Sequence, residues 1–314
     1  MNKILTKISF IIFIIPMIVL VNNFIVANAD ETSENNVNAV HIIDPNDNKV
    51  ITTIIPQPYH LELDLPYYKS QVELIVKKIA KGSATKSGYS QKMILDRIDP
   101  TTGNIIKGRP KMILDEKVLV GKIMELSFTG GKVNLPIKLT KSGYDEKEAA
   151  SLSEVVLASY TTRFNPNRIG RSKNIELSAS SINNVIVGSG DIFSFNDTVG
   201  PRDIAAGYQE APEFLQGKIV VGIGGGICQT SSTLFNAIDQ LEVKILERHR
   251  HTRDIGYVPK GRDATVSFGG LDFSFQNTLG IPVLIKAYYS MYGSITVQIR
   301  TSKENEYMLR NLED

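Results

Sequence analysis

Hydrophobic residues in the first half of the chain follow the spacings of both helices and strands. Over 70–81 the apolar side chains recur every three or four residues, which predicts an amphipathic helix. A second helix is expected over 115–126. Alternation of apolar and polar residues predicts strands over 59–65, 92–98 and 133–139. Together these elements indicate a small α+β domain over 39–142.

The second half of the chain combines fewer helices with more short strands. An apolar stripe predicts a helix over 172–187, and another helix is expected over 230–239, after a glycine run. Extended segments are predicted over 191–195, 241–252, 264–268 and 273–275, with a hairpin formed by 283–287 and 295–299. We therefore expect an α+β protein. Its second domain, over 143–300, should be mixed and largely antiparallel, with a loose charged tail over 301–314.

The first 29 residues have the pattern of a secretory signal. Lys3 and Lys7 precede an apolar stretch, and Ala27-Asn28-Ala29 has the small-x-small form of a cleavage site. An uncleaved membrane anchor is the alternative, because apolar residues resume at 24–26. Residues 30–38 are polar and predict a linker. Both interpretations place the body of the protein outside the cytoplasm, with membrane contact only through the N-terminal segment if it is uncleaved.

The net charge of the chain argues against one class of protein. The formal net charge is +2 and no segment concentrates basic residues, so a nucleic-acid-binding protein is not expected. Hydrophobic residues make up 42% of the chain, which is enough to form real cores.

Cys228 is the only cysteine among the 314 residues. In an exported protein, a single cysteine cannot form an internal disulfide. Gly225 and Gly226 precede it and allow a tight turn and the close approach of a substrate. The helix predicted to follow favours the thiolate through its positive N-terminal end. These features predict a nucleophile, and the competing interpretation is a small, inert buried residue.

His249 and His251 are the candidate bases. On a strand they would project from the same face, so either could take the proton of Cys228 and return it to a leaving amine. Asp263 is a candidate for orienting the histidine. The backbone N–H of Cys228 and the side chain of Gln229 are candidate donors to an oxyanion.

Arg248 and Arg253 are candidates for binding a substrate carboxylate through their planar guanidinium groups. The competing interpretation is a solvated charged strand with local ion pairs. The glycine run lacks the spacing of a dinucleotide-binding loop and the lysine of a phosphate-binding loop. One cysteine with two histidines two residues apart does not match zinc-ligand spacing. We therefore expect neither a metal nor a cofactor.

Five short motifs, in order along the second half, resemble the VanW family. They are Asp191-Ile192-Phe193-Ser194-Phe195-Asn196 with Thr198-Val199-Gly200-Pro201-Arg202; Gly207-Tyr208-x-Glu210-Ala211-Pro212; Gly224-Gly225-Gly226-Ile227-Cys228-Gln229 with Ser232-Thr233-Leu234-Phe235-Asn236-Ala237; Glu247-Arg248-x-x-His251; and Tyr257-Val258-Pro259-x-Gly261-x-Asp263-Ala264-Thr265-Val266. Residues 39–140 resemble, more loosely, a peptidoglycan-binding domain that often precedes this family's domain.

The resemblance implies a function in the cell wall. VanW domains are linked to glycopeptide resistance and to L,D-transpeptidation of peptidoglycan with a cysteine nucleophile. The family cysteine falls on Cys228 and the family histidine on His251, whereas His249 falls on a variable position. The expected partners are therefore peptidoglycan stem peptides, joined in third-to-third cross-links. Two alternatives stay open, a wall-binding protein without catalysis and a cysteine endopeptidase of the NlpC type.

Overall fold

The computed structural model describes residues 26–27, 38–56, 64–215 and 218–311. They form two compact units: the first holds the described residues up to Ser83 together with Asp115–Pro136, and the second holds Ala84–Leu114 together with the described residues from Ile137 onward. This division differs from the predicted boundary near residue 142, because strands within 84–114 pair with strands of the second unit. The predicted signal segment and linker lie almost entirely outside the described residues, and the binding role of the first domain stays a prediction.

The first unit combines a sheet with two helices. The sheet has the order β1 (Val26–Ala27), β3 (Val50–Ile54), β2 (Val40–Ile43) and β7 (Gly131–Asn134). Strands β2 and β7 are parallel, and the other neighbours are antiparallel. Helices α2 (Leu65–Lys81) and α3 (Glu116–Leu126) pack together, and both predicted helices are present. The buried Tyr68 hydroxyl on α2 lies 2.6 Å from the Ser127 hydroxyl beside the end of α3.

Helix α2 begins earlier than the apolar spacing predicts. The Asp64 carboxylate accepts the backbone N–H of Tyr67, and Pro66 occupies the first turn, where its missing N–H costs nothing. Gly82, with φ of 79°, ends the helix. The predicted strand over 59–65 is wrong at its end, since Leu65 is helical, and 57–63 lie outside the described residues.

The segment predicted as one strand over 133–139 is two strands. Pro136, which has no N–H to donate, separates β7 from β8 (Ile137–Thr140). Strand β8 pairs with β6 (Lys111–Leu114), whose last residue, Leu114, lies opposite Ile137.

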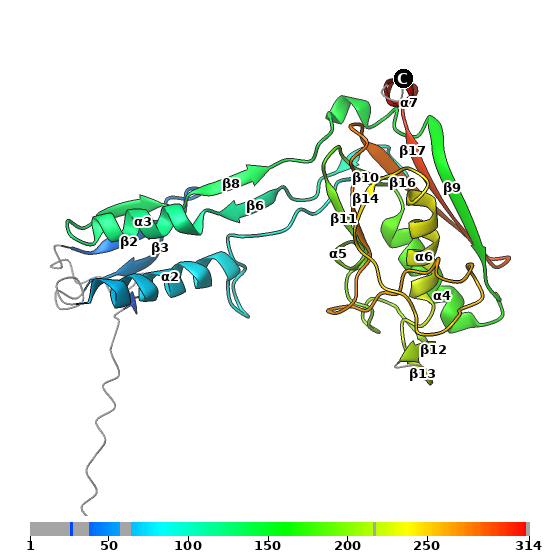
Figure 1. Cartoon of the computed structure of the whole chain (residues 1–314), viewed down its shortest axis with the longest axis horizontal. Coiled ribbons are helices and arrows are strands. Elements are labelled where there is room, and N and C mark those ends of the chain that lie inside the picture. Colours follow the sequence, from blue (N-terminus) through cyan, green and yellow to red (C-terminus); the bar gives the residue numbers. More distant parts are fainter. Residues whose placement is uncertain (1–25, 28–37, 57–63, 216–217, 312–314) are drawn as a thin grey trace, which may run out of the picture. The chain divides into compact units, whose positions relative to one another are not determined.

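The main sheet of the second unit is antiparallel throughout, as predicted for this domain (Figure 1). In the described residues its order is β5 (Ile105–Ile106), β4 (Arg97–Ile98), β10 (Val185–Val187), β16 (Val283–Ser290), β17 (Ser294–Thr301) and β9 (Val155–Arg163). The predicted hairpin is the pair β16–β17. Helix α4 (Ile169–Ile182) packs against β16, and α6 (Ile227–Ile238) packs against β17 and β9.

Helix α4 ends before the predicted residue 187. Asn184 has φ of 63°, a left-handed conformation that interrupts a helix. The following residues Val185, Ile186 and Val187 are β-branched and enter the sheet as β10. Val185 and Val187 belong to the main core beneath the helices, whereas Ile186 faces a smaller cluster with Leu152.

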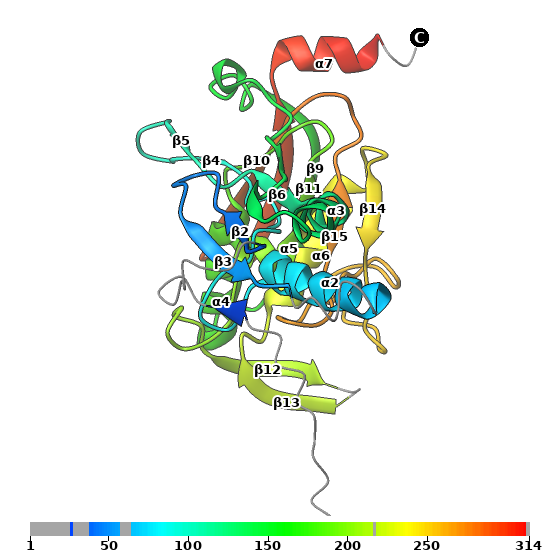
Figure 2. The same cartoon turned by 90° about the vertical axis from the view of Figure 1, so that its left-hand side faces the viewer.

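Smaller elements complete the second unit. A three-stranded sheet has the order β11 (Ile192–Ser194), β15 (Ser274–Gln276) and β14 (Lys244–Glu247). Figure 2 shows β12 (Glu210–Leu215) and β13 (Lys218–Ile223) as a separate hairpin at the lower edge of the view. The remaining short helices are η1 (Glu146–Glu148) and α5 (Phe195–Val199).

Two predictions about this part are wrong. Within its described residues the tail is not loose, because Ser302 caps α7 (Lys303–Arg310) by accepting the N–H of Asn305. Residues 264–268 form no regular strand; only Thr265 makes an isolated bridge, to His249. Across the described ranges, no helix is both long and apolar enough to span a membrane.

Candidate active site

Cys228 lies at the start of α6, which begins three residues earlier than predicted. Gly226 is the N-cap with φ of 114°, and Gly224 has φ of 94°, conformations that favour glycine. Cys228 is the second helical residue, a free and half-buried thiol. Its N–H is among the first four of the helix, which have no partner within the helix.

The glycines before Cys228 are required by close protein contacts. A Cβ on Gly225 would lie 2.6 Å from the Ala211 carbonyl oxygen, and one on Gly226 would lie 2.9 Å from Cγ of Arg171. Both glycines line the cavity beside Cys228. They therefore seat the loop against its neighbours rather than simply leaving open space for a substrate.

His251 is fixed by Asp263. The Asp263 carboxylate accepts the backbone N–H of His251 at 2.6 Å and lies 2.7 Å from its Nδ1. Asp263 is only 5% exposed, so this pair is shielded from water. Because a carboxylate only accepts hydrogen bonds, Nδ1 carries the hydrogen, and Nε2 is left to act on other groups.

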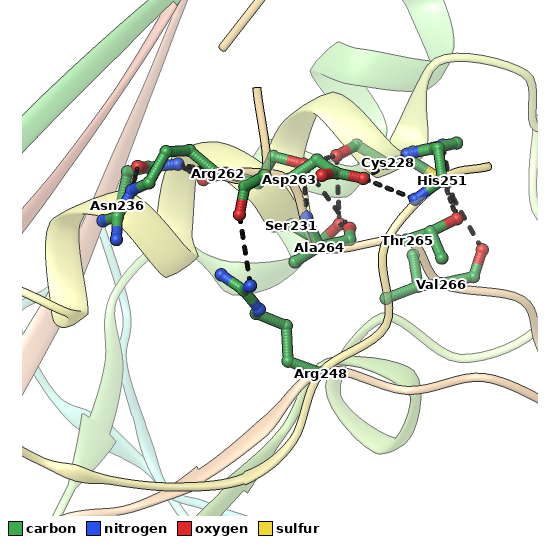
Figure 3. A network of polar contacts seen from close by, with 12 residues as sticks. Cys228, Ser231, Asn236, Arg248, His251, Arg262, Asp263, Ala264, Thr265 and Val266 are labelled. Atoms are coloured by element: carbon green, nitrogen blue, oxygen red, sulfur yellow. Dashed lines mark hydrogen bonds and ion pairs between the residues drawn. The ribbon is translucent and has the colours of Figure 1, made fainter. Parts of the chain in front are cut away.

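Cys228, His251 and Thr265 are in mutual contact (Figure 3). The Thr265 hydroxyl lies 3.3 Å from Nε2 of His251 and 3.6 Å from Sγ of Cys228. The thiol also lies 3.5 Å from the Val266 carbonyl oxygen. The His251 side chain also interacts electrostatically with the Cys228 thiol.

This contact favours the ionised form of both groups. Burial raises the pKa of the Cys228 thiol, but the hydrogen bond and charge of His251 outweigh burial and leave that pKa below its ordinary value. Burial lowers the pKa of His251, and the hydrogen bonds and charges of Cys228 and Asp263 outweigh it, so the net direction is upward. A thiolate beside an imidazolium is the state in which cysteine attacks a carbonyl.

The polar face of α6 holds the segment that carries Asp263. Ser231 donates to the Ala264 carbonyl at 2.5 Å, and the Ala264 N–H donates to Ser232 at 2.9 Å. Asn236 donates to the Arg262 carbonyl at 2.7 Å. These bonds fix Asp263 to the same helix that bears Cys228 (Figure 3).

Two predicted site residues point elsewhere. His249 lies 2.8 Å from the Glu247 carboxylate, not beside Cys228. Strand β14 ends at Glu247, so the two histidines do not share a strand face. Gln229 is fully buried, and its amide nitrogen donates to the Thr162 hydroxyl and the Arg163 carbonyl. Gln229 is therefore not available as an oxyanion donor.

The two arginines predicted to bind a substrate carboxylate also lie in different surroundings. Arg248 stacks over the Phe235 ring at 4.1 Å and donates to the Gly261 carbonyl, a structural role. Arg253 lies on the wall of a smaller cavity, of about 370 Å³, that shares His251 with the main one.

A cavity of about 680 Å³ opens at Cys228 and His251. Its wall includes Arg171, Arg202 and Tyr257, which are not among the predicted site residues. Arg202 and Tyr257 lie within the motifs that resemble the VanW family, and this was the available signal. For Arg171 the sequence offered none. In the described segments, no group of three or more His, Cys, Asp or Glu is arranged to hold a metal ion.

Comparisons with known proteins agree with these motifs. The family model described as VanW like protein matches residues 170–300. The uncharacterized protein YoaR of Bacillus subtilis is 43% identical over 210 residues, which are 64% of this chain and 69% of that protein. The vancomycin B-type resistance protein VanW of Enterococcus faecalis is 31% identical over 109 residues, 33% of this chain and 40% of that protein. No solved structure matches the chain significantly. With its motifs and a relative covered over more than two thirds of its length, the chain belongs to the VanW family.

Proposed function

We propose that this protein is an extracytoplasmic L,D-transpeptidase that joins peptidoglycan stem peptides through an acyl-enzyme on Cys228. The observation that carries this proposal is the chain of contacts from Cys228 through His251 to the buried Asp263. It is the nucleophile–base–orienting acid arrangement used in acyl transfer. The name of one relative, a vancomycin-resistance protein, supports a role in the cell wall.

In the first half-reaction the Cys228 thiolate attacks the carbonyl carbon between the third residue and the terminal D-residue of a tetrapeptide stem. The tetrahedral oxyanion accepts the Cys228 N–H at the positive end of α6. The carbon–nitrogen bond then breaks, and the leaving amine takes a proton from the His251 imidazolium. A thioester and a neutral imidazole remain.

In the second half-reaction a side-chain amine of another stem attacks the thioester carbonyl. The neutral His251 accepts the proton of that amine, and the thiolate leaves. The product is a third-to-third amide cross-link, and the thiolate–imidazolium pair is restored. Asp263 keeps Nδ1 occupied through both steps, so Nε2 always faces the reacting groups.

Product analysis on purified stem peptides tests the proposal. The wild-type protein should convert tetrapeptide stems to cross-linked dimers with release of the terminal D-residue, and Cys228→Ala should give neither product. Trimmed monomers without dimers would instead indicate a hydrolase, and a cut within the stem would identify it as a cysteine endopeptidase. Binding of the stems with no product would support a wall-binding protein, and either result would contradict transpeptidation.

A further inference from the structure

Two arginines in the wall of the Cys228 cavity have unpaired N–H groups. Nη1 of Arg171 and both Nη atoms of Arg202 are buried, and none has a hydrogen-bond partner among the described residues. Buried donors without partners cost free energy, more so when they carry charge. Native proteins contain few such groups, and each one calls for an explanation, such as a functional role or a bound water or ion.

Aromatic rings beside these arginines attract their charge without supplying acceptors for those atoms. Arg202 lies over the rings of Phe195 and Phe268, each 5.7 Å from its guanidinium carbon. Arg171 lies 6.0 Å from the Tyr257 ring centre. An aromatic face attracts a cation but cannot replace a carboxylate oxygen as a hydrogen-bond acceptor.

Both side chains lie beside the loop that positions Cys228. A Cβ on Gly224 would lie 3.1 Å from Cβ of Arg202, and one on Gly226 would lie 3.3 Å from Nη1 of Arg171. The charge of Cys228 also acts on both guanidinium groups. The two cations therefore flank the nucleophile.

Charge in the cavity wall favours an anion. Exposed Arg168 adds a third cation, and Glu213 is the acidic residue of the described wall. Arg171 is held in place at its other nitrogen, where Nη2 donates to the Gln229 amide oxygen at 2.9 Å. The guanidinium is thus oriented before any substrate arrives, which reduces the entropy lost on binding.

We propose that Arg171 and Arg202 form a carboxylate-binding subsite that recognises the donor peptide beside the bond to be cleaved. The identity of the peptide rests on the proposed function, whereas the anion preference of the subsite does not. Paired planar guanidinium groups match the geometry of a carboxylate. That carboxylate belongs either to the terminal D-residue or to the side chain of the third residue.

Alkylation of Cys228 with a charged and a neutral reagent tests the subsite without any cross-linking assay. Iodoacetate is an anion and iodoacetamide is neutral, so the ratio of their rates reports the positive charge near the thiol. Arg171→Gln and Arg202→Gln should each lower this ratio by about threefold or more. Arg310→Gln removes the same charge from an exposed ion pair on α7 and should leave the ratio unchanged.

Two controls separate a loss of charge from a loss of folding. Arg171→Lys keeps the charge and should keep most of the ratio, and thermal unfolding of each variant establishes that it is folded. A ratio unchanged in folded Arg202→Gln and Arg171→Gln would overturn the subsite, even if cross-linking is observed. A lowered ratio in a protein that makes no cross-links would sustain the subsite and contradict the proposed function.

Calorimetry with Cys228→Ala identifies the carboxylate. The probes are a tetrapeptide stem, its C-terminal amide, and a stem amidated at the third-residue side chain. The amide that removes the recognised carboxylate should weaken binding about tenfold or more, and Arg202→Gln should abolish that difference. Equal binding of all three probes would overturn the subsite.

Discussion

At the residue scale, the proposed acyl transfer depends on the imidazole of His251, which lies between the Asp263 carboxylate and the Cys228 thiol. Asp263 fixes the ring of His251 through two contacts, one to the backbone and one to Nδ1. The Thr265 hydroxyl lies beside both Nε2 and the sulfur. The result is a Cys228 pKa below 9.0 and a His251 pKa above 6.5. Both shifts favour the thiolate beside the imidazolium.

The first prediction concerns the pH dependence of thiol alkylation. A group with a lowered pKa stays ionised as the pH falls below its ordinary value, so iodoacetamide should react rapidly below pH 9.0 and slow only through the lowered pKa. His251→Ala leaves burial unopposed by the imidazolium and should move the midpoint upward. His249→Ala is the matched control and should leave it unchanged, since His249 contacts Glu247. Equal midpoints in all three proteins would contradict the pairing.

The second prediction concerns Asp263. Asp263→Asn can still accept one hydrogen bond, but it no longer imposes the Nδ1–H tautomer or stabilises the imidazolium. We expect kcat for release of the terminal D-residue to fall by about 100-fold or more, with little change in KM. Steady-state kinetics measure this split. A rise in KM with kcat unchanged would instead indicate that Asp263 binds substrate.

At the element scale, α6 does two tasks with one buried polar face. Its first turn presents Cys228, and Ser231, Ser232 and Asn236 bind the backbone of the segment around Asp263. From sequence, this polar run looks like an open, solvated platform. Burial of the whole run shows instead that its hydroxyls and amides replace water as partners for an irregular segment.

The third prediction follows from this face. Asn236 donates to the Arg262 carbonyl and accepts the Nε–H of Arg262 at 2.8 Å. Asn236→Ala leaves both groups unpaired and should lower the free energy of unfolding by about 1–3 kcal/mol. Urea denaturation measures the change. Gln240→Ala, at an exposed position after α6, should cost well under ~1 kcal/mol, and equal losses would contradict a special role for Asn236.

At the scale of the whole molecule, the second unit is discontinuous in sequence. Residues 115–136 belong to the first unit, so the chain leaves the second unit after Leu114 and returns to it at Ile137. Those two residues lie opposite each other on the antiparallel pair β6–β8. The domain boundary predicted at 142 therefore misses strands β4 and β5 of the main sheet.

The fourth prediction uses this topology. A chain of residues 84–314 with 115–136 replaced by Asn-Gly should close β6 and β8 as a hairpin, because that dipeptide favours the required turn. It should keep the rapid alkylation of Cys228. A chain of 143–314, which exposes the edge of β10, should unfold at a lower temperature. Equal midpoints in thermal scans would contradict the contribution of 84–114.

Sequence patterns predicted the elements that depend on residues close together in the chain. Periodicity predicted α2, α3 and the β16–β17 hairpin, and the surroundings of a single cysteine singled out Cys228. The roles of Gln229, Arg171 and Arg202, in contrast, depend on residues that are distant in the sequence. Gln229 is occupied by Thr162 and Arg163, whereas the two arginines are distinguished by the partners that they lack. No local pattern encodes either property.

Intact-protein mass spectrometry during turnover tests the central claim most directly. Incubation with a tetrapeptide stem whose side-chain amine is blocked should add to the protein the mass of the stem minus that of the released D-amino acid. Peptide mapping should place that mass on Cys228, and hydroxylamine should remove it as expected of a thioester. The adduct should be absent from Cys228→Ala and should accumulate more slowly in His251→Ala. An adduct on another residue, or product formation by Cys228→Ala, would contradict the account.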